Sequence, residues 1–86
     1  MKVIFTPKAK KVFLKLDKTI QQQIKKFILK LEAMMDPRTS GKMLVGNLIG
    51  LWRYRVGDYR VLCKIKNNEL VITVIDVGHR RDVYDK

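Results

Sequence analysis

The sequence predicts an α+β fold in which an N-terminal strand and an antiparallel pair of helices pack on a mainly antiparallel sheet of four strands. Two observations support this prediction. A short β-prone run opens the chain, and apolar residues then recur at helical spacing as far as residue 35. From residue 51 onward the apolar residues instead alternate with a period of two, in three runs separated by turn signals. The expected order of elements is therefore β-α-α-β-β-β.

The N-terminal half carries the signals for one strand and two helices. A first strand is expected at Lys2–Phe5, ahead of Thr6-Pro7. Threonine is a good helix N-cap and proline suits the first helical position, so a first helix is predicted over Pro7–Leu16. Asp17 is a second N-cap, and the apolar stripe that follows it ends before Asp36-Pro37. Because the link at Asp17 is short, the two helices should form an antiparallel hairpin.

The C-terminal half is predicted to be a loop followed by a three-stranded meander. The loop spans Arg38–Gly50 and contains an apolar interval, Met43–Val45, that can pair briefly with a strand. Three strands follow, over Leu51–Val56, Tyr59–Lys66 and Glu69–Val77. Between them stand Gly57-Asp58 and Asn67-Asn68, both strong signals for two-residue hairpin turns.

Counting from these turns divides the meander into two faces. The first turn places Arg55 opposite Arg60, and the second places Lys66 opposite Glu69. One face is apolar enough to take the helices, and it carries Tyr54, Val56, Tyr59, Val61, Cys63, Ile65, Leu70, Ile72 and Val74, with Trp52 at its far end. The other face is cationic, with Arg53, Arg55, Arg60 and Lys64 among Leu62, Val71, Thr73, Ile75 and Val77.

Composition and charge limit the classes of function. The chain has 86 residues, 19 Lys or Arg against 8 Asp or Glu, and a net charge of +11, so we expect one domain over residues 1–86 that binds a polyanion. No apolar run is long enough for a spanning helix or a secretory signal, which predicts a cytoplasmic protein with no membrane partner. The single cysteine, Cys63, excludes an internal disulfide, and no residues at metal-ligand spacing accompany it, so neither a metal nor another cofactor is expected.

The cationic face is the candidate site. Arg55 opposite Arg60 is a local conflict, because like charges on adjacent strands repel. Guanidinium groups clustered on a rigid sheet bind phosphate in a bidentate manner, and an anion between them would relieve the repulsion; a solvated outer face is the alternative interpretation. With Val77 on the same face, the chain through Gly78 should bring His79, Arg80 and Arg81 to the rim of this site.

Four further side chains have two interpretations each. His79 is the only histidine, and histidine ordinarily exchanges protons near neutral pH, although a lone histidine is often incidental. Tyr84 either packs or stacks on a base. Trp52 either covers the sheet or offers a stacking platform near the arginines. Cys63 lies on the inward face, which favours a buried, inert thiol over a nucleophile.

Five segments, taken together and in order, carry a specific pattern. They are the opening Val-Ile-Phe-Thr-Pro-Lys-Ala, the Gly41-Lys42-Met43-Leu44 loop with Gly46, the strand Leu51-Trp52-Arg53-Tyr54-Arg55-Val56, the turn Gly57-Asp58-Tyr59-Arg60-Val61 and the ending Val77-Gly78-His79-Arg80-Arg81-Asp82-Val83-Tyr84. With this order of elements, the chain resembles the RelE family of bacterial toxins, in the RelE/ParE superfamily, over essentially its whole length.

The resemblance implies a ribosome-dependent endoribonuclease that cleaves mRNA in the A site without a metal, by attack of the ribose 2′-hydroxyl on the adjacent phosphate. Carried over by position, the catalytic set is Arg53, Arg55, Arg60, His79, Arg80 and Tyr84, and the RNA-binding set is Lys42, Lys64, Arg81 and Trp52. RelE-like enzymes often have lysines where this chain has Arg53 and Arg55. Because arginine stays charged, those two should hold phosphate, and proton transfer should fall to His79 and Tyr84.

The resemblance also implies partners, and alternatives stay open. The expected partners are a RelB-like antitoxin, ribosomal RNA and mRNA, and the toxin–antitoxin complex can bind operator DNA through the antitoxin. One alternative is a ParE-like toxin of the same fold that inhibits DNA gyrase without nuclease chemistry. Another is a non-catalytic module that binds RNA or the ribosome.

Overall fold

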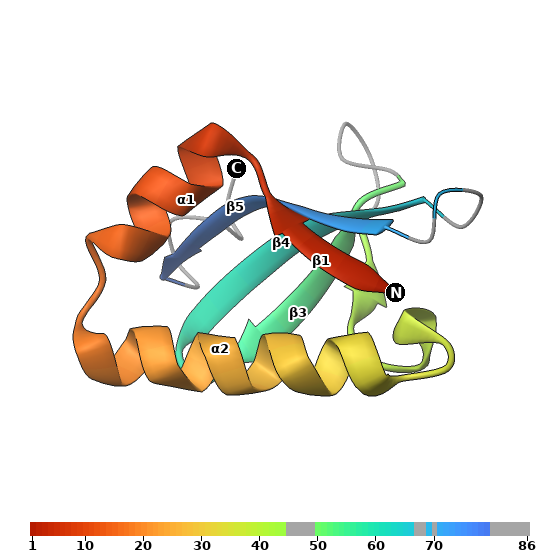
Figure 1. Ribbon diagram of the computed structural model, residues 1–86, viewed down its shortest axis with the longest axis horizontal. Helices are drawn as coiled ribbons and strands as arrows, with labels where there is room; N and C mark the ends of the chain where they lie inside the picture. Colours follow the sequence, from red (N-terminus) through yellow and green to blue (C-terminus); the bar gives the residue numbers. More distant parts are fainter. Residues whose placement is uncertain (45–49, 67–68, 70, 80–86) are drawn as a thin grey trace.

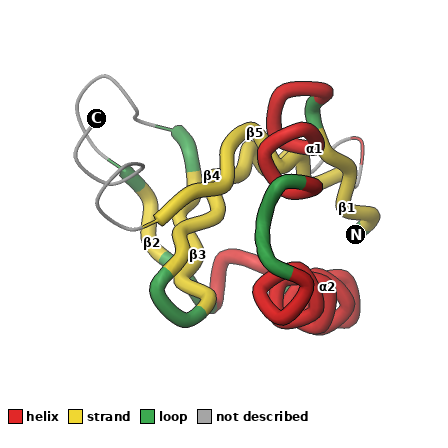
Figure 2. Tube along the Cα trace, turned by 90° about the vertical axis from the view of Figure 1, so that its left-hand side faces the viewer, coloured by secondary structure: helices red, strands yellow, loops and turns green. Residues whose placement is uncertain are grey.

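The structure is a computed structural model that describes residues 1–44, 50–66, 69 and 71–79 (Figure 1). Its elements, in chain order, are β1 (Lys2–Phe5), α1 (Pro7–Leu14), α2 (Lys18–Ala33), a short 3-10 helix (Pro37–Thr39), β2 (Lys42–Met43), β3 (Trp52–Val56), β4 (Tyr59–Lys66) and β5 (Val71–His79). Both helices lie on the same side of the sheet, as Figure 2 shows. The predicted α+β architecture is confirmed.

The sheet has five strands, in the order β1-β5-β4-β3-β2, rather than the predicted four. The additional strand is β2, a two-residue strand that pairs antiparallel with β3 through Lys42↔Arg53 and Met43↔Trp52. The sequence predicted only a brief pairing here, starting one residue later. β1 lies parallel to β5, and the other pairs are antiparallel.

The boundaries of α1 follow local capping, whereas Asp17, the predicted N-cap of α2, makes no side-chain cap hydrogen bond. The Thr6 hydroxyl accepts a hydrogen bond from the Ala9 backbone N–H at 3.1 Å, as expected of an N-cap. α1 ends at Leu14, two residues before the predicted end, where the Gln21 amide donates to the Leu14 and Leu16 carbonyls at 3.2 and 2.9 Å. These bonds satisfy carbonyls that would otherwise lack partners at the end of a helix.

The core lies between the helices and the inner face of the sheet. The helices contribute Ala9, Phe13, Ile24 and Leu31, and the sheet contributes Tyr54, Val56, Val61, Cys63, Ile72, Val74 and Val77. Apart from Val77, each of these sheet residues was predicted to face inward. The alternation of apolar residues along the first two strands of the meander therefore identified the buried face correctly.

The register of the meander departs from the prediction at its second hairpin. The first hairpin is as predicted, with Arg55 opposite Arg60. In the second, Lys66 lies opposite Val71 rather than Glu69, a shift of two residues that leaves each side chain on its predicted face.

A β-bulge then reverses the faces along the rest of β5. Cys63 lies opposite Val74, but Leu62 lies opposite Asp76, so β5 carries one extra residue at this point. Beyond the bulge Val77 lies opposite Val61 and is only 2% exposed. The prediction that Val77 shares the arginine face is therefore wrong, and Asp76 lies on that face instead.

Candidate functional site

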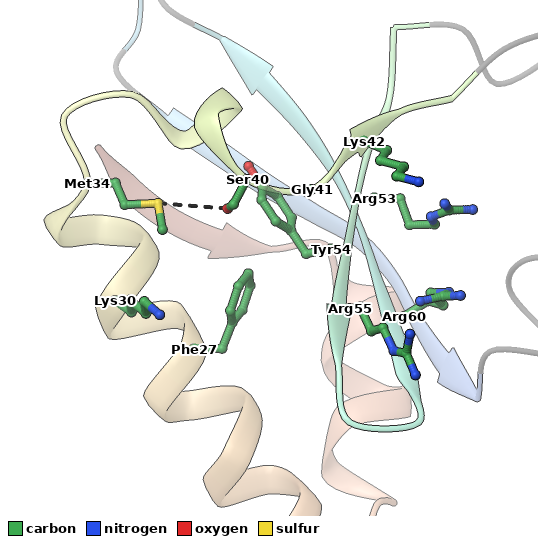
Figure 3. A pocket seen from close by; sticks show the side chains of 10 residues that line it. All are labelled: Phe27, Lys30, Met34, Ser40, Gly41, Lys42, Arg53, Tyr54, Arg55 and Arg60. Atoms are coloured by element: carbon green, nitrogen blue, oxygen red, sulfur yellow. Dashed lines mark hydrogen bonds between the residues drawn. The ribbon is translucent and has the colours of Figure 1, made fainter.

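The candidate site is built on the outer face of the β3–β4 hairpin, away from the helices. Arg55 lies directly opposite Arg60, and Arg53 lies two residues along β3 on the same face. Lys42 of β2 lies opposite Arg53, so cations from three adjacent strands share this face. Figure 3 shows the three arginine side chains pointing away from α2. The tight turn at Gly57-Asp58 fixes the hairpin register, and that register brings the arginines together.

A cavity of about 460 Å³ reaches around the open edge of β3 beside these cations. It exists because β2 begins at Lys42 and leaves the rest of the β3 edge uncovered. Five of its lining residues are cationic and none is acidic; the cationic ones are Lys30, Lys42, Arg53, Arg55 and Arg60. Two aromatic residues that also line the cavity, Phe27 and Tyr54, have ring centroids 5.2 Å apart. The arrangement favours an anionic ligand.

The segment before β2 is held firmly against β3. The Trp52 indole N–H donates to the Ser40 carbonyl at 2.7 Å, and the Tyr54 hydroxyl donates to the Pro37 carbonyl at 2.6 Å. Burial raises the pKa of Tyr54 well above its ordinary value, so the hydroxyl keeps its proton as a donor at neutral pH. These bonds hold Lys42 beside Arg53.

Trp52 and Cys63 both belong to the helix-covered side of the sheet. Trp52 lies opposite Cys63, is half-buried and packs against the core. Its position favours the packing interpretation over a stacking platform among the arginines. Cys63 is fully buried, and burial raises the pKa of its thiol to about 12, as expected of an inert thiol.

The structure does not bring His79 and Lys64 into the arginine cluster. The bulge places His79 opposite Tyr59, on the other face from Arg60, and the two rings meet edge to face with centroids 5.8 Å apart. Lys64 shares the arginine face but lies opposite Thr73, on the far side of Leu62 from Arg60. Three further candidates, Arg80, Arg81 and Tyr84, lie outside the described residues.

Asp76 is the residue at this site that sequence reasoning missed. It lies opposite Leu62 on the arginine face, next to Gly78, which lies opposite Arg60. No signal in the sequence marks the bulge, since apolar residues occupy both faces of β5 along its first five residues, with Thr73 as the one polar exception.

The described part of the chain holds neither a metal-binding cluster nor a membrane-spanning helix. No three His, Cys, Asp or Glu side chains gather there as they would around a metal ion. Neither helix described is both long and apolar enough to cross a membrane.

Comparison with known families and structures gives a consistent result. Residues 3–84 match the family described as the ParE toxin of the type II toxin–antitoxin system, parDE. Among solved structures, the chain is similar to the toxin–antitoxin complex RelBE2 from Mycobacterium tuberculosis, with 30% identity and a TM-score of 0.82 over 92% of this chain and 90% of that chain. It is also similar to the archaeal RelE–RelB complex from Pyrococcus horikoshii, with 26% identity and a TM-score of 0.72 over 92% and 93% of the two chains.

A third similar structure is a mutant of the Escherichia coli toxin RelE in the free state. It has 24% identity and a TM-score of 0.77, over 96% of this chain and 86% of that chain, and at this identity it supports the fold alone. A comparison with curated protein sequences found no significant match.

Proposed function

The chain belongs to the ParE toxin family of type II toxin–antitoxin systems, in the RelE/ParE superfamily, and we propose that it cleaves mRNA on the ribosome. The observation that supports this activity is the pair Arg55 and Arg60, placed directly opposite each other with Arg53 on the same face. Like charges on facing strand residues repel, and a phosphate between them matches the geometry of the guanidinium groups.

The reaction we propose needs no nucleophile from the protein. The ribose 2′-hydroxyl attacks the adjacent phosphorus, and the 5′ oxygen leaves, which produces a cyclic phosphate. Arg53, Arg55 and Arg60 hold the phosphate and stabilise the negative charge that grows on it in the transition state. Because arginine keeps its proton at any working pH, a different group must accept the proton of the 2′-hydroxyl. His79 and Tyr84 are the candidates that the sequence indicates for proton transfer.

The proposed partners follow from the charge and from the relatives. Two similar structures, RelBE2 and the archaeal RelE–RelB complex, are complexes of a toxin with an antitoxin, so we propose a RelB-type antitoxin here, with operator DNA bound through it. The net charge of +11 suits ribosomal RNA, which would place the toxin in the cytoplasm, where ribosomes are found. Lys42 and Lys64 would then contact RNA backbone without reading its sequence.

A second candidate function is inhibition of DNA gyrase by protein contact. One observation favours it: the family that the chain matches is described as the ParE toxin family. The arginine cluster and the similarity to RelBE2 at 30% identity favour the nuclease.

The test is primer extension on mRNA after incubation with purified ribosomes and the toxin. We expect cuts phased with codons, and Arg55→Gln or Arg60→Gln should lower the cleavage rate by about 10²–10³-fold. Lys66→Gln is the matched control, because it removes one charge from β4 at Lys66, which pairs with Glu69 at 4.0 Å outside the site. Intact mRNA together with loss of gyrase supercoiling would support the ParE-like alternative. If neither mRNA cleavage nor loss of supercoiling is observed, the chain is a non-catalytic binding module.

A further inference from the structure

The bulge in β5 turns an acidic side chain toward the arginine face. Ile75 and Asp76 are both half-buried, whereas the residues on either side of them, Val74 and Val77, are buried in the core. Two successive residues thus leave the inner face together, as a bulge allows. Asp76 lies opposite Leu62 and is a diagonal neighbour of Arg60. Diagonal neighbours lie about 7–8 Å apart, within reach of a long side chain.

The carboxylate of Asp76 is oriented by the backbone. Its Oδ1 atom accepts a hydrogen bond from the Val77 N–H at 2.9 Å. Within the described residues, no hydrogen bond or ion pair engages Oδ2. Gly78, opposite Arg60, has no side chain.

On these grounds we propose that Asp76 is the general base of the cleavage reaction, an inference that rests on the proposed function. Among the described residues of β3, β4 and β5, Asp76 is the only carboxylate on the arginine face. The nearby arginines cannot accept a proton, and His79 lies on the other face with Tyr59. A carboxylate oxygen, unlike a guanidinium nitrogen, has a lone pair that can accept a proton.

The reaction needs no reagent other than water. Oδ2 of Asp76 takes the proton from the 2′-hydroxyl as the 2′ oxygen forms its bond to phosphorus. The bond from phosphorus to the 5′ oxygen breaks, and the leaving oxygen takes a proton from water. The products are a 2′,3′-cyclic phosphate and a 5′-hydroxyl, and Asp76 afterwards releases its proton to solvent.

The test uses single-turnover cleavage of mRNA on ribosomes by the full-length chain and two matched variants. Asp76→Asn keeps the oxygen that accepts from Val77 but cannot act as a base, so we expect a rate about 10²–10⁴-fold lower with little change in the concentration for half-saturation. Asp58→Asn makes the same change in the exposed β3–β4 turn and should cleave at the wild-type rate. Thermal unfolding checks that both variants fold.

A second variant separates a base from a residue that only positions Arg60. In Asp76→Ala, added formate should restore part of the lost rate, because a small carboxylate can occupy the vacated space and accept the proton. The inference is overturned if Asp76→Asn cleaves within twofold of the wild-type rate. It is also overturned if formate does not restore the rate of Asp76→Ala and the toxin concentration for half-saturation rises. Wild-type protein that leaves mRNA intact instead overturns the proposed function itself, and this inference with it.

Discussion

The Tyr54 hydroxyl donates a hydrogen bond to the Pro37 carbonyl at 2.6 Å, and this bond joins β3 to the segment that leads into β2. Both groups are shielded from water, since Tyr54 is only 1% exposed and Pro37 is buried. A buried carbonyl that loses its donor keeps the cost of its desolvation. The bond therefore stabilises the position of Lys42 as well as the core.

We expect Tyr54→Phe to lower the free energy of unfolding by about 1–3 kcal/mol, because it leaves the Pro37 carbonyl without its donor. Urea unfolding followed by circular dichroism measures the change. Tyr59→Phe is the control, since Tyr59 is half-buried and its hydroxyl makes no hydrogen bond to a described residue. Equal losses in the two variants would mean that the bond from Tyr54 to the Pro37 carbonyl contributes nothing measurable.

Gly41 is expected to tolerate no side chain. Its φ is +75°, and a Cβ there would lie 2.6 Å from the Arg53 carbonyl oxygen and 2.8 Å from the Tyr54 ring. Gly41→Ala should cost more than the roughly 1–2 kcal/mol that a left-handed backbone alone imposes on alanine, since the chain must also move away from β3. Gly50→Ala separates the cost of the left-handed backbone from the cost of the steric clash, because Gly50 has a φ of +93° but nothing within 4 Å of a Cβ placed there. Similar losses of unfolding free energy in both variants would contradict the close packing.

The first hairpin and its arginine cluster could be predicted because local chemistry determines them. Gly57-Asp58 favours one turn length, and a known turn length sets the register of every pair up to Arg53. The start of α1 was predictable for the same reason, since Thr6 and Pro7 act on adjacent backbone.

The face of β5 beyond the bulge could not be predicted from the sequence. Val71, Ile72, Thr73, Val74 and Ile75 are all β-branched, so no alternation between polar and apolar residues shows where one residue is skipped. Val77 fits either face equally well. Packing against the helices decides the outcome, and the same bulge places Asp76 among the arginines and His79 beside Tyr59. The prediction that cations at His79 and beyond extend this face assumed an unbroken period of two.

Stability should fall at alkaline pH through Cys63. Burial raises the pKa of this thiol from 9.0 to about 12, so the folded protein keeps the neutral form after the unfolded chain has begun to ionise. The stabilisation is complete below pH 9 and is lost as pH rises toward 12, by about 1 kcal/mol at pH 10. Urea unfolding from pH 7 to 10.5 should show this slope in wild type and a shallower one in Cys63→Ala. Identical slopes would mean that the thiol does not contribute.

The repulsion between Arg55 and Arg60 predicts that one change should raise stability and remove function together. Arg55→Gln takes away a cation directly opposite another, so we expect a gain in unfolding free energy of about 0.2–1 kcal/mol at low salt. The gain should shrink in 1 M salt, where ions already screen the pair. Lys66→Gln removes the same charge but breaks the contact with Glu69, so it should give no gain. A gain that persists at high salt would show that repulsion is not the cause. A stabilised variant that no longer cleaves or binds RNA would indicate that the cluster is retained for its ligand, because the folded chain alone is better off without it.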